Sequence, residues 1–448
     1  MNKVSGLLVL LLLLVTAPGY AAPSPSGLPE ITVRDNVTRT VLKNGLTVLV
    51  VEDHTSDIVG LEVLFRVGQV NEDDSTAGIT NLIQSILVRR ISKATSEDDP
   101  HGVESKGSIL NGNANPDYAE ISLLTDAKNF PDFLGSISQA VAQRTFRDEE
   151  LNEERRKMVE YLEGDQRVFR AIYEIFLQQF YRYHPYRQPQ EGHAGSVRQL
   201  SKPRVEAYYA RYYAPNRTVI SVVGDVDRRK VISILEEKLG PLPQGDDKRL
   251  EVSWEPKPVE KELYLSSGSN LAWIFLGYPA PGMKSPDYMP MRVLHSILGE
   301  GLSSRLWVEL REKRGLAYEL GSIYPTLEGP SHMIEYIVTT PNQLNESQSR
   351  IFKEIKRIQK DPVSPSELEG AKRKLIGAYL LERETNRGKA LQLGLAELLA
   401  GGYQYDLQVL DRVRRVTQQD VLRVAQLFLK ENYTLVVARP RSSGFSFP

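Results

Sequence analysis

Two hydrophobic patterns alternate along the chain, and each predicts a different kind of secondary structure. Runs rich in β-branched residues predict strands, as in 40–52, where Asn44-Gly45 between two such runs is typical of a hairpin turn. Apolar residues at helical spacing predict amphipathic helices, as in 78–89, where Ile79, Leu82, Ile83, Ile86 and Leu87 share one face. The chain is therefore predicted to mix sheet strands with helices that bury one side.

The same patterns predict the order of elements in the first half. The expected elements after the hairpin are a strand at 58–67, the helix at 78–89, an extended stretch at 108–124, helices from 130 to about 181, a helix at 202–213 and a strand at 218–223. Turns are expected inside the extended stretch, at 111–113 and 115–117, because Asn, Gly and Pro gather there.

The second half repeats this order. The segments Val197-Arg-Gln-Leu and Asn216-Arg-Thr-Val-Ile, on either side of a helix, correspond to Val413-Arg-Arg-Val and Asn432-Tyr-Thr-Leu-Val, both 216 positions later. Several such matches in one order indicate two duplicated α+β domains. The predicted boundaries are 30–240 and 261–443, joined by a Pro- and charge-rich linker at 241–260.

Composition and the first residues limit the classes of function. The 56 basic and 57 acidic side chains nearly cancel and form no basic stripe, so nucleic acid is not an expected partner. Lys3, the apolar run 7–15 and a small-residue end predict a signal peptide at 1–21, too short in its apolar part to be a stable transmembrane anchor. An exported chain without cysteine lacks disulfides, which favours a bacterial periplasmic location.

The stretch 298–322 contains the strongest candidates for functional residues. Gly299 and Gly301 predict a turn before a capped helix, and Gly315 is typical of the end of that helix. A strand is expected at 316–323. This arrangement would set Arg311, on the last helical turn, close to Tyr318, so that a guanidinium and a phenol could converge on one ligand. From the residues alone, a solvated Arg and a packed Tyr remain the alternative.

This stretch resembles a signature of the insulinase/pitrilysin family of zinc metallopeptidases. The resemblance is in Gly-x-Gly-x-Ser-Ser-Arg-Leu at 299–306 and Glu-Leu-Arg-Glu-Lys-Arg-Gly-Leu-Ala-Tyr at 309–318. It implies two domains of similar fold, each a mostly antiparallel sheet packed against helices, which together form half of a clamshell. It also implies that Arg311 and Tyr318 contact substrate near a zinc site on the other half.

The family's zinc motif, His-x-x-Glu-His, is degenerate in this chain. The resemblance aligns it with Asn81, Gln84 and Ser85, and aligns the third zinc ligand with or near Tyr161. Amide and hydroxyl oxygens bind Zn²⁺ poorly, and Gln84 cannot accept a proton from water. We therefore expect no metal or other cofactor on this chain.

The resemblance then predicts a function in a complex. The expected role is the non-catalytic, substrate-binding subunit of a periplasmic heteromeric zinc metalloendopeptidase that acts on peptides or unfolded segments. Its partner would be a homologous subunit with an intact motif, which would hold the zinc. The alternative is a proteolytically silent scaffold or binding protein of the same fold, and a self-sufficient peptidase is disfavoured.

Overall fold

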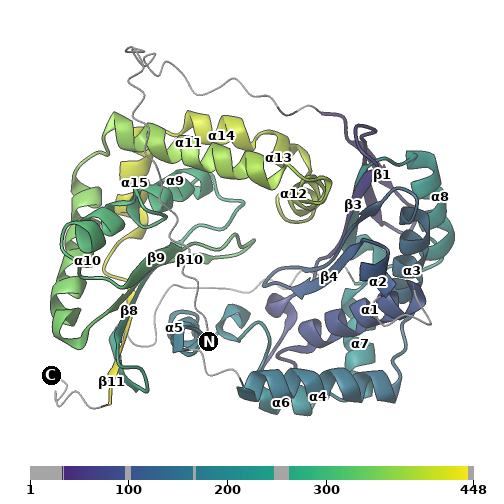
Figure 1. Cartoon of the computed structure of the whole chain (residues 1–448), viewed down its shortest axis with the longest axis horizontal. Coiled ribbons are helices and arrows are strands. Elements are labelled where there is room, and N and C mark those ends of the chain that lie inside the picture. Colours follow the sequence, from purple (N-terminus) through teal and green to yellow (C-terminus); the bar gives the residue numbers. More distant parts are fainter. Residues whose placement is uncertain (1–32, 34, 96–101, 165–167, 247–261, 442–448) are drawn as a thin grey trace, which may run out of the picture. The chain divides into compact units, whose positions relative to one another are not determined.

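The computed structural model describes residues 33–441, apart from residue 34 and the segments 96–101, 165–167 and 247–261 (Figure 1). The predicted signal peptide and most of the predicted linker lie outside these residues. None of the described helices combines the length and the apolar character that a membrane span requires.

The first half of the chain forms a six-stranded sheet in the order β1-β2-β6-β3-β5-β4. Neighbouring strands are antiparallel except β2 and β6, which are parallel. The predicted Asn44-Gly45 turn joins β1 to β2, and Gly45 has a φ of +87° that favours glycine. The strands are β1 (Thr38–Val41), β2 (Thr47–Glu52), β3 (Ile58–Phe65), β4 (Ile109–Ala114), β5 (Ala119–Asp126) and β6 (Thr218–Gly224).

Helices cover one face of this sheet with the apolar positions that the sequence indicated. The five predicted positions of α1, from Ile79 to Leu87, are all fully buried, in a core shared with α3, α7 and α8. The helices of this half are α1 (Ile79–Thr95), α2 (Gly102–Ser105), α3 (Phe130–Ala142), α4 (Asp148–Gly164), α5 (Val168–Phe180), α6 (Ala194–Arg198), α7 (Lys202–Tyr212) and α8 (Arg228–Leu239). Short 3₁₀ turns are η1 (Gln69–Asn71), η2 (Pro185–Arg187) and η3 (Pro215–Arg217).

The second half forms a five-stranded sheet in the order β7-β11-β8-β10-β9, in which β7 and β11 are parallel and the other pairs antiparallel. Its strands are β7 (Glu262–Ser267), β8 (Ala272–Ala280), β9 (Glu319–Ile323), β10 (Ser331–Thr339) and β11 (Thr434–Pro440). Its helices are α9 (Tyr288–Leu298), α10 (Leu344–Lys360), α11 (Pro365–Glu382), α12 (Asn386–Leu399), α13 (Gln404–Leu407), α14 (Val409–Arg415) and α15 (Gln418–Phe428), with a 3₁₀ turn η5 (Pro341–Gln343).

The two sheets share one topology. The order β2-β6-β3-β5-β4 corresponds strand by strand to β7-β11-β8-β10-β9, and the single parallel pair falls at the same place in both. Helices between corresponding strands also correspond, so that α1 matches α9, α4 matches α11 and α5 matches α12. The predicted fold class is thereby confirmed, whereas the predicted domain boundaries stay a prediction.

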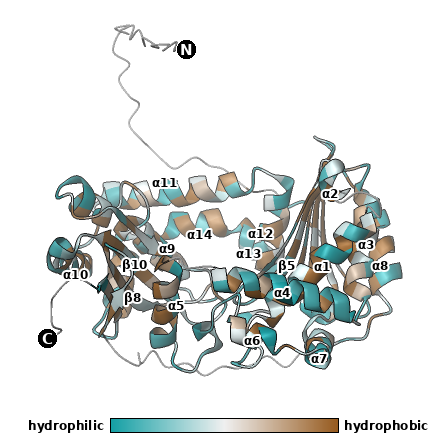
Figure 2. Cartoon of the chain, turned by 60° about the horizontal axis from the view of Figure 1, so that its bottom comes forward, coloured by the Kyte–Doolittle hydropathy of each residue, from teal (hydrophilic) through white to brown (hydrophobic). Residues whose placement is uncertain are grey.

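Each sheet is covered on its second face by a helix from the other half. Phe176 of α5 packs against Phe275 of β8 and Val436 of β11. Conversely, Leu393 of α12 lies in one cluster with Leu64 of β3 and Val219 of β6. Figure 2 shows the strands of both halves as mostly hydrophobic and α4 as mostly hydrophilic. The two halves are therefore joined by an exchange of apolar helices.

One expected turn is absent from the structure. Strand β4 runs through Asn111-Gly112-Asn113 without interruption, and these residues pair in register with residues 120–122 of β5. β4 is an edge strand with one exposed face, so its two Asn side chains need no burial. At Gly112 a Cβ would meet the side chain of Val88, so this glycine allows α1 to approach the sheet. The turn predicted at 115–117 does connect β4 to β5.

Replacing Phe176 by alanine tests whether the helix exchange stabilises the chain. Phe176 is fully buried and its ring lies directly over Gly277, so the variant leaves a cavity that the backbone cannot fill. We expect Phe176→Ala to cost about 3–5 kcal/mol, measured as a lower midpoint of unfolding. Tyr183→Ala is the matched control, because Tyr183 is 77% exposed and should change stability by less than about 0.5 kcal/mol. Equal midpoints for the two variants would contradict a structural role of α5.

Candidate functional site

The segment that leads to Arg311 is held by a buried arginine. Arg305 is 9% exposed, and its guanidinium donates from Nε to Glu367 Oε1 at 2.7 Å and from Nη2 to Oε2 at 3.2 Å. Glu367 also accepts from the backbone N–H of Ser364 at 2.9 Å, in a capping box at the start of α11. Arg305 had no predicted role. The sequence feature that could have indicated this role is the Ser-x-x-Glu capping pattern at 364–367, whose glutamate is the partner of Arg305.

The helix that follows is a π-helix and not the expected α-helix. It spans η4 (Trp307–Glu312), and the N–H of Lys313 donates to Val308 O at 3.0 Å, an i to i+5 bond. Gly315 ends the turn with a φ of +62°, as predicted. The strand begins at Glu319, three residues later than expected, although Tyr318 N already donates to Val338 O at 2.9 Å. Such wide turns often occur at functional sites.

The structure brings Arg311 and Tyr318 together through the backbone. Arg311 Nη1 donates to the carbonyl oxygen of Tyr318 and, at 3.4 Å, to that of Ala317. Its guanidinium carbon lies 4.8 Å from the centre of the Trp307 ring, a cation–π distance. The Tyr318 side chain is 62% exposed. The guanidinium is thus fixed by two carbonyls and one ring, while the phenol projects into solvent.

A buried acid supports the turn before this helix. Glu335 of β10 lies opposite Ser322 of β9, whose hydroxyl donates to Glu335 Oε1 at 2.8 Å. Its other oxygen packs against Gly299, where a side chain would collide with it. Burial raises the pKa of Glu335 to about 8, against a smaller opposing effect of the Ser322 hydrogen bond. The carboxyl group is therefore protonated at neutral pH.

The predicted zinc-motif positions Asn81, Gln84 and Ser85 lie on α1, and the side chains of Gln84 and Ser85 form hydrogen bonds within the chain. Gln84 is fully buried, and its Nε2 donates to the hydroxyl of Tyr213 at 3.1 Å. The Ser85 hydroxyl donates to Asn81 O at 3.2 Å, within the helix. Gln84 Oε1 makes no hydrogen bond to the described residues. This part of α1 presents amide and hydroxyl groups to its surroundings.

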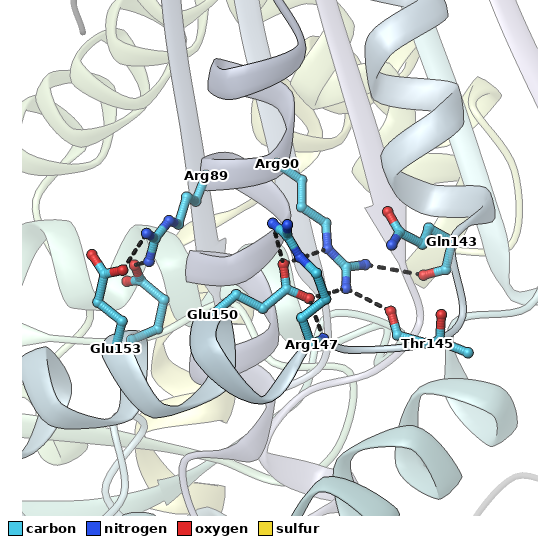
Figure 3. Close-up of polar contacts among 8 residues, drawn as sticks. Arg89, Arg90, Gln143, Thr145, Arg147, Glu150 and Glu153 are labelled. Atoms are coloured by element: carbon cyan, nitrogen blue, oxygen red, sulfur yellow. Dashed lines mark hydrogen bonds and ion pairs between the residues drawn. The ribbon is translucent and has the colours of Figure 1, made fainter. Parts of the chain in front are cut away.

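Ion pairs join α1 to α4 one to two turns beyond these positions (Figure 3). Arg89 pairs with Glu153 and, at 3.0 Å, with Glu154. The next residue, Arg90, pairs with the buried Glu150 and donates to the carbonyl oxygens of Gln143 at 3.1 Å and Thr145 at 2.7 Å. Figure 3 shows both guanidinium groups reaching from α1 to the acids of α4. These contacts hold together the two helices that the family's zinc ligands would come from.

Tyr161 lies on α4 and is 50% exposed. Its ring centre is 5.8 Å from the guanidinium carbon of Arg170, on α5. The two acids beside Tyr161 are already paired, Glu160 with Arg156 at 2.8 Å and Glu163 with Arg198. These neighbouring carboxylates are therefore engaged in surface ion pairs.

A cavity of about 410 Å³ adjoins Arg170. Its walls are mainly apolar and include Phe169 and Leu177 of α5 and Leu327 of the β9–β10 connection. The charged residues of the lining are paired with one another. Arg170 donates to Glu174 at 2.7 Å and lies 3.5 Å from Glu191. His332 lies in the inner wall, with hydrogen bonds to the hydroxyls of Tyr181 at 2.8 Å and Tyr173 at 3.2 Å. Burial lowers the pKa of His332 to about 3, so its imidazole is neutral at neutral pH.

Two sequence profiles of one family match this chain. The profile of insulinase (peptidase family M16) matches residues 47–190, and that of the peptidase M16 inactive domain matches residues 199–375. The chain belongs to the insulinase family. The first match includes all four positions of the degenerate zinc motif, and the second includes Arg311 and Tyr318.

Relatives of this insulinase-family chain match it along nearly its whole length. Zinc protease PqqE of Helicobacter pylori is 25% identical over 97% of this chain and 98% of the relative. The solved structure of a peptidase M16 inactive domain from Pseudomonas fluorescens has a TM-score of 0.80 at 22% identity, over 92% of this chain and 100% of that one. A chain of complex III2 from Candida albicans has a TM-score of 0.76 at 16% identity, over 92% and 98%.

The residues that the resemblance assigns to the family's metal position do not fit zinc. A zinc site in a peptidase needs imidazole or carboxylate ligands and an open position for water. Asn81, Gln84, Ser85 and Tyr161 offer two amides, a hydroxyl and a phenol. Within the part of the chain that the structure describes, no three His, Cys, Asp or Glu side chains are grouped as metal ligands. These side chains therefore provide no zinc ligand set on this insulinase-family chain.

The buried acid below the Arg311 helix predicts a pH dependence of stability. The folded pKa of Glu335, about 8, lies above its ordinary value of 4.5, so the stability due to the neutral carboxyl is fully present below pH 4.5 and lost as pH rises through 8. Glu335→Gln cannot ionise. We expect its melting temperature to exceed that of wild type by an amount that grows from about pH 5 to about pH 8 and then stays constant, as measured by thermal unfolding.

The control for this measurement is Glu346→Gln, at an exposed position of α10 that pairs with Arg350 at 3.3 Å. Its melting curve should follow that of wild type across the same pH range. A constant difference between Glu335→Gln and wild type at every pH would contradict a buried, neutral Glu335.

Proposed function

We propose that this chain is the non-catalytic, substrate-binding subunit of a periplasmic heteromeric zinc metalloendopeptidase that acts on peptides or unfolded segments. One observation carries the proposal. The positions for metal binding are held by Asn81, Gln84 and Ser85, which cannot act as zinc ligands or as a general base, whereas Arg311 and Tyr318 remain beside one another at the surface.

The geometry supports a division of roles between Arg311 and Tyr318. Two carbonyls and the Trp307 ring orient Arg311, and its remaining N–H groups can donate to a substrate carbonyl. The exposed Tyr318 hydroxyl can donate to the oxyanion that develops at the scissile carbonyl, which is worth about 3–4 kcal/mol for one such donor. The zinc of the partner subunit would supply the activated water. The apolar cavity near Tyr161 has room for a substrate side chain.

The second candidate function is a proteolytically silent scaffold or binding protein. The observation that favours it is the shared fold with a chain of complex III2 from Candida albicans. In that case the Arg311 and Tyr318 pair has no catalytic role. The presence of a homologous subunit with an intact His-x-x-Glu-His motif in the same organism favours the first candidate, and its absence favours the scaffold.

Reconstitution tests the proposed subunit role. The mature chain alone should cleave no quenched fluorescent peptide and should contain no stoichiometric zinc by metal analysis. Mixed with a homologous subunit that carries the intact motif, it should form a stable complex with peptidase activity above that of either chain. Zinc and activity in this chain alone would overturn the assignment. A stable complex without gain in activity would favour the scaffold.

Changing Tyr318 to phenylalanine tests the oxyanion role in the reconstituted complex. Loss of one oxyanion donor lowers turnover by about 10²–10³-fold. We expect kcat to fall by that order with little change in KM, because the interaction forms mainly in the transition state. Tyr183→Phe serves as the control, since Tyr183 is also exposed but lies outside this element. An unchanged kcat would remove Tyr318 from the mechanism.

A further inference from the structure

A second cavity, of about 340 Å³, lies between α9, α11, α12, α13 and α14 of the second half, and Tyr118 of the β4–β5 connection also lines it. Its walls are mainly apolar and aromatic and include Met289, Leu375, Leu395 and Tyr405. Its position in the second half corresponds to that of the zinc-motif helices in the first half, because α9 and α11 correspond to α1 and α4 in the repeat. The role proposed for Arg311 and Tyr318 does not involve this cavity.

Several polar groups in this cavity already have partners. The Tyr379 hydroxyl donates to Asp406 Oδ1 at 2.9 Å, and Asp406 also pairs with Arg383. The hydroxyl of Tyr288 is 2.6 Å from that of Thr326. These contacts occupy the polar groups that they join. Recognition of a charged ligand is therefore left to other residues of the cavity.

Arg292 of α9 is the exception. It is half-buried and lines the cavity, and among the described residues its guanidinium makes one hydrogen bond, from Nη1 to Tyr324 O at 3.1 Å. No carboxylate of the described residues lies within 4.0 Å of it. Glu300, paired with Lys374 at 3.1 Å, and Glu382, which accepts from Gln392 at 2.7 Å, both feel the charge of Arg292, which lowers their pKa values against the effect of burial. Neither forms an ion pair with it, and a half-buried guanidinium without a contacting carboxylate loses hydration and favours a bound anion.

We propose that this cavity binds the carboxyl-terminal residue of a peptide that ends in an apolar side chain. The free carboxylate pairs with Arg292, and the side chain packs against Met289, Leu375 and Leu395. The exposed Glu382 lies in the lining and can accept a hydrogen bond from a backbone N–H of the peptide. An N–H donor distinguishes a peptide from an aliphatic carboxylate of the same shape, for which Glu382 is only repulsive. This site would operate whether or not the chain contributes to a peptidase.

Calorimetric titration of the mature chain tests this proposal with three probes. They are N-acetyl-Ala-Ala-Leu as the free acid, the same peptide as the carboxyl-terminal amide, and octanoate. The free acid should bind at least about tenfold more tightly than the amide, because only the acid forms the charge-assisted pair. Octanoate should bind more weakly than the free acid. This comparison uses the wild-type chain and does not depend on the folding of any variant.

Two variants test whether Arg292 causes the difference in affinity between the peptide acid and the amide. Arg292→Gln should weaken binding of the free acid by at least about tenfold and leave binding of the amide unchanged. Arg373→Gln is the matched control, because Arg373 lies exposed on α11 outside the cavity lining and should change neither affinity. Thermal unfolding of both variants checks that they are folded.

Four results would overturn the proposal. They are equal binding of acid and amide, full affinity in a folded Arg292→Gln variant, octanoate binding as tightly as the peptide acid, and no binding of the acid at millimolar concentration. Octanoate binding as tight as that of the peptide acid would identify the ligand as an aliphatic carboxylate. The activity of the reconstituted peptidase is not a readout here, so failure of this proposal and failure of the subunit role are distinguishable.

Discussion

Each sheet of this chain has two apolar faces, and helices from its own half of the sequence cover only one of them. The second face is covered by a helix from the other half, α5 on β8 and β11 and α12 on β3 and β6. Burying such a face is the main favourable term in folding, so neither half is complete without the other. The exchange of helices also shapes the two cavities, because α5 lines the cavity near Tyr161 and α12 lines the cavity that contains Arg292.

The helix pair α1 and α4, to which the resemblance assigns the family's metal position, is held together without metal ligands. In a zinc peptidase the metal itself would bridge α1 and α4. In this chain the helices are joined by Arg89 with Glu153 and Glu154, and by Arg90 with the buried Glu150. Removing one partner of a buried pair is costly, so these residues can maintain the helix geometry without a metal. A conserved fold with changed chemistry is the expected result when packing and ligation rest on different residues.

The Arg311 element depends on groups that do not touch a ligand themselves. Arg305 ties its start to the capping box of α11, and the protonated Glu335 packs below Gly299. The π-helix then adds one residue to the turn, and the Arg311 guanidinium is held by two backbone carbonyls. Rigid support of this kind keeps a donor at a fixed position, which is what stabilisation of a transition state requires.

The sequence by itself determined the elements whose signals are local. The strand periodicity, the Asn44-Gly45 turn and the apolar stripe of α1 depend on neighbours a few positions away, and the repeat made the duplicated fold predictable. The assignment of the zinc-motif positions to Asn81, Gln84 and Ser85 also rests on the sequence alone and stays a prediction. Tertiary structure decided the rest. Four features depend on groups far away in the sequence: continuous pairing through Gly112, the π-helix, the neutral state of Glu335, and the half-buried Arg292 without a contacting carboxylate. Burial and electrostatic surroundings arise only when distant elements pack together.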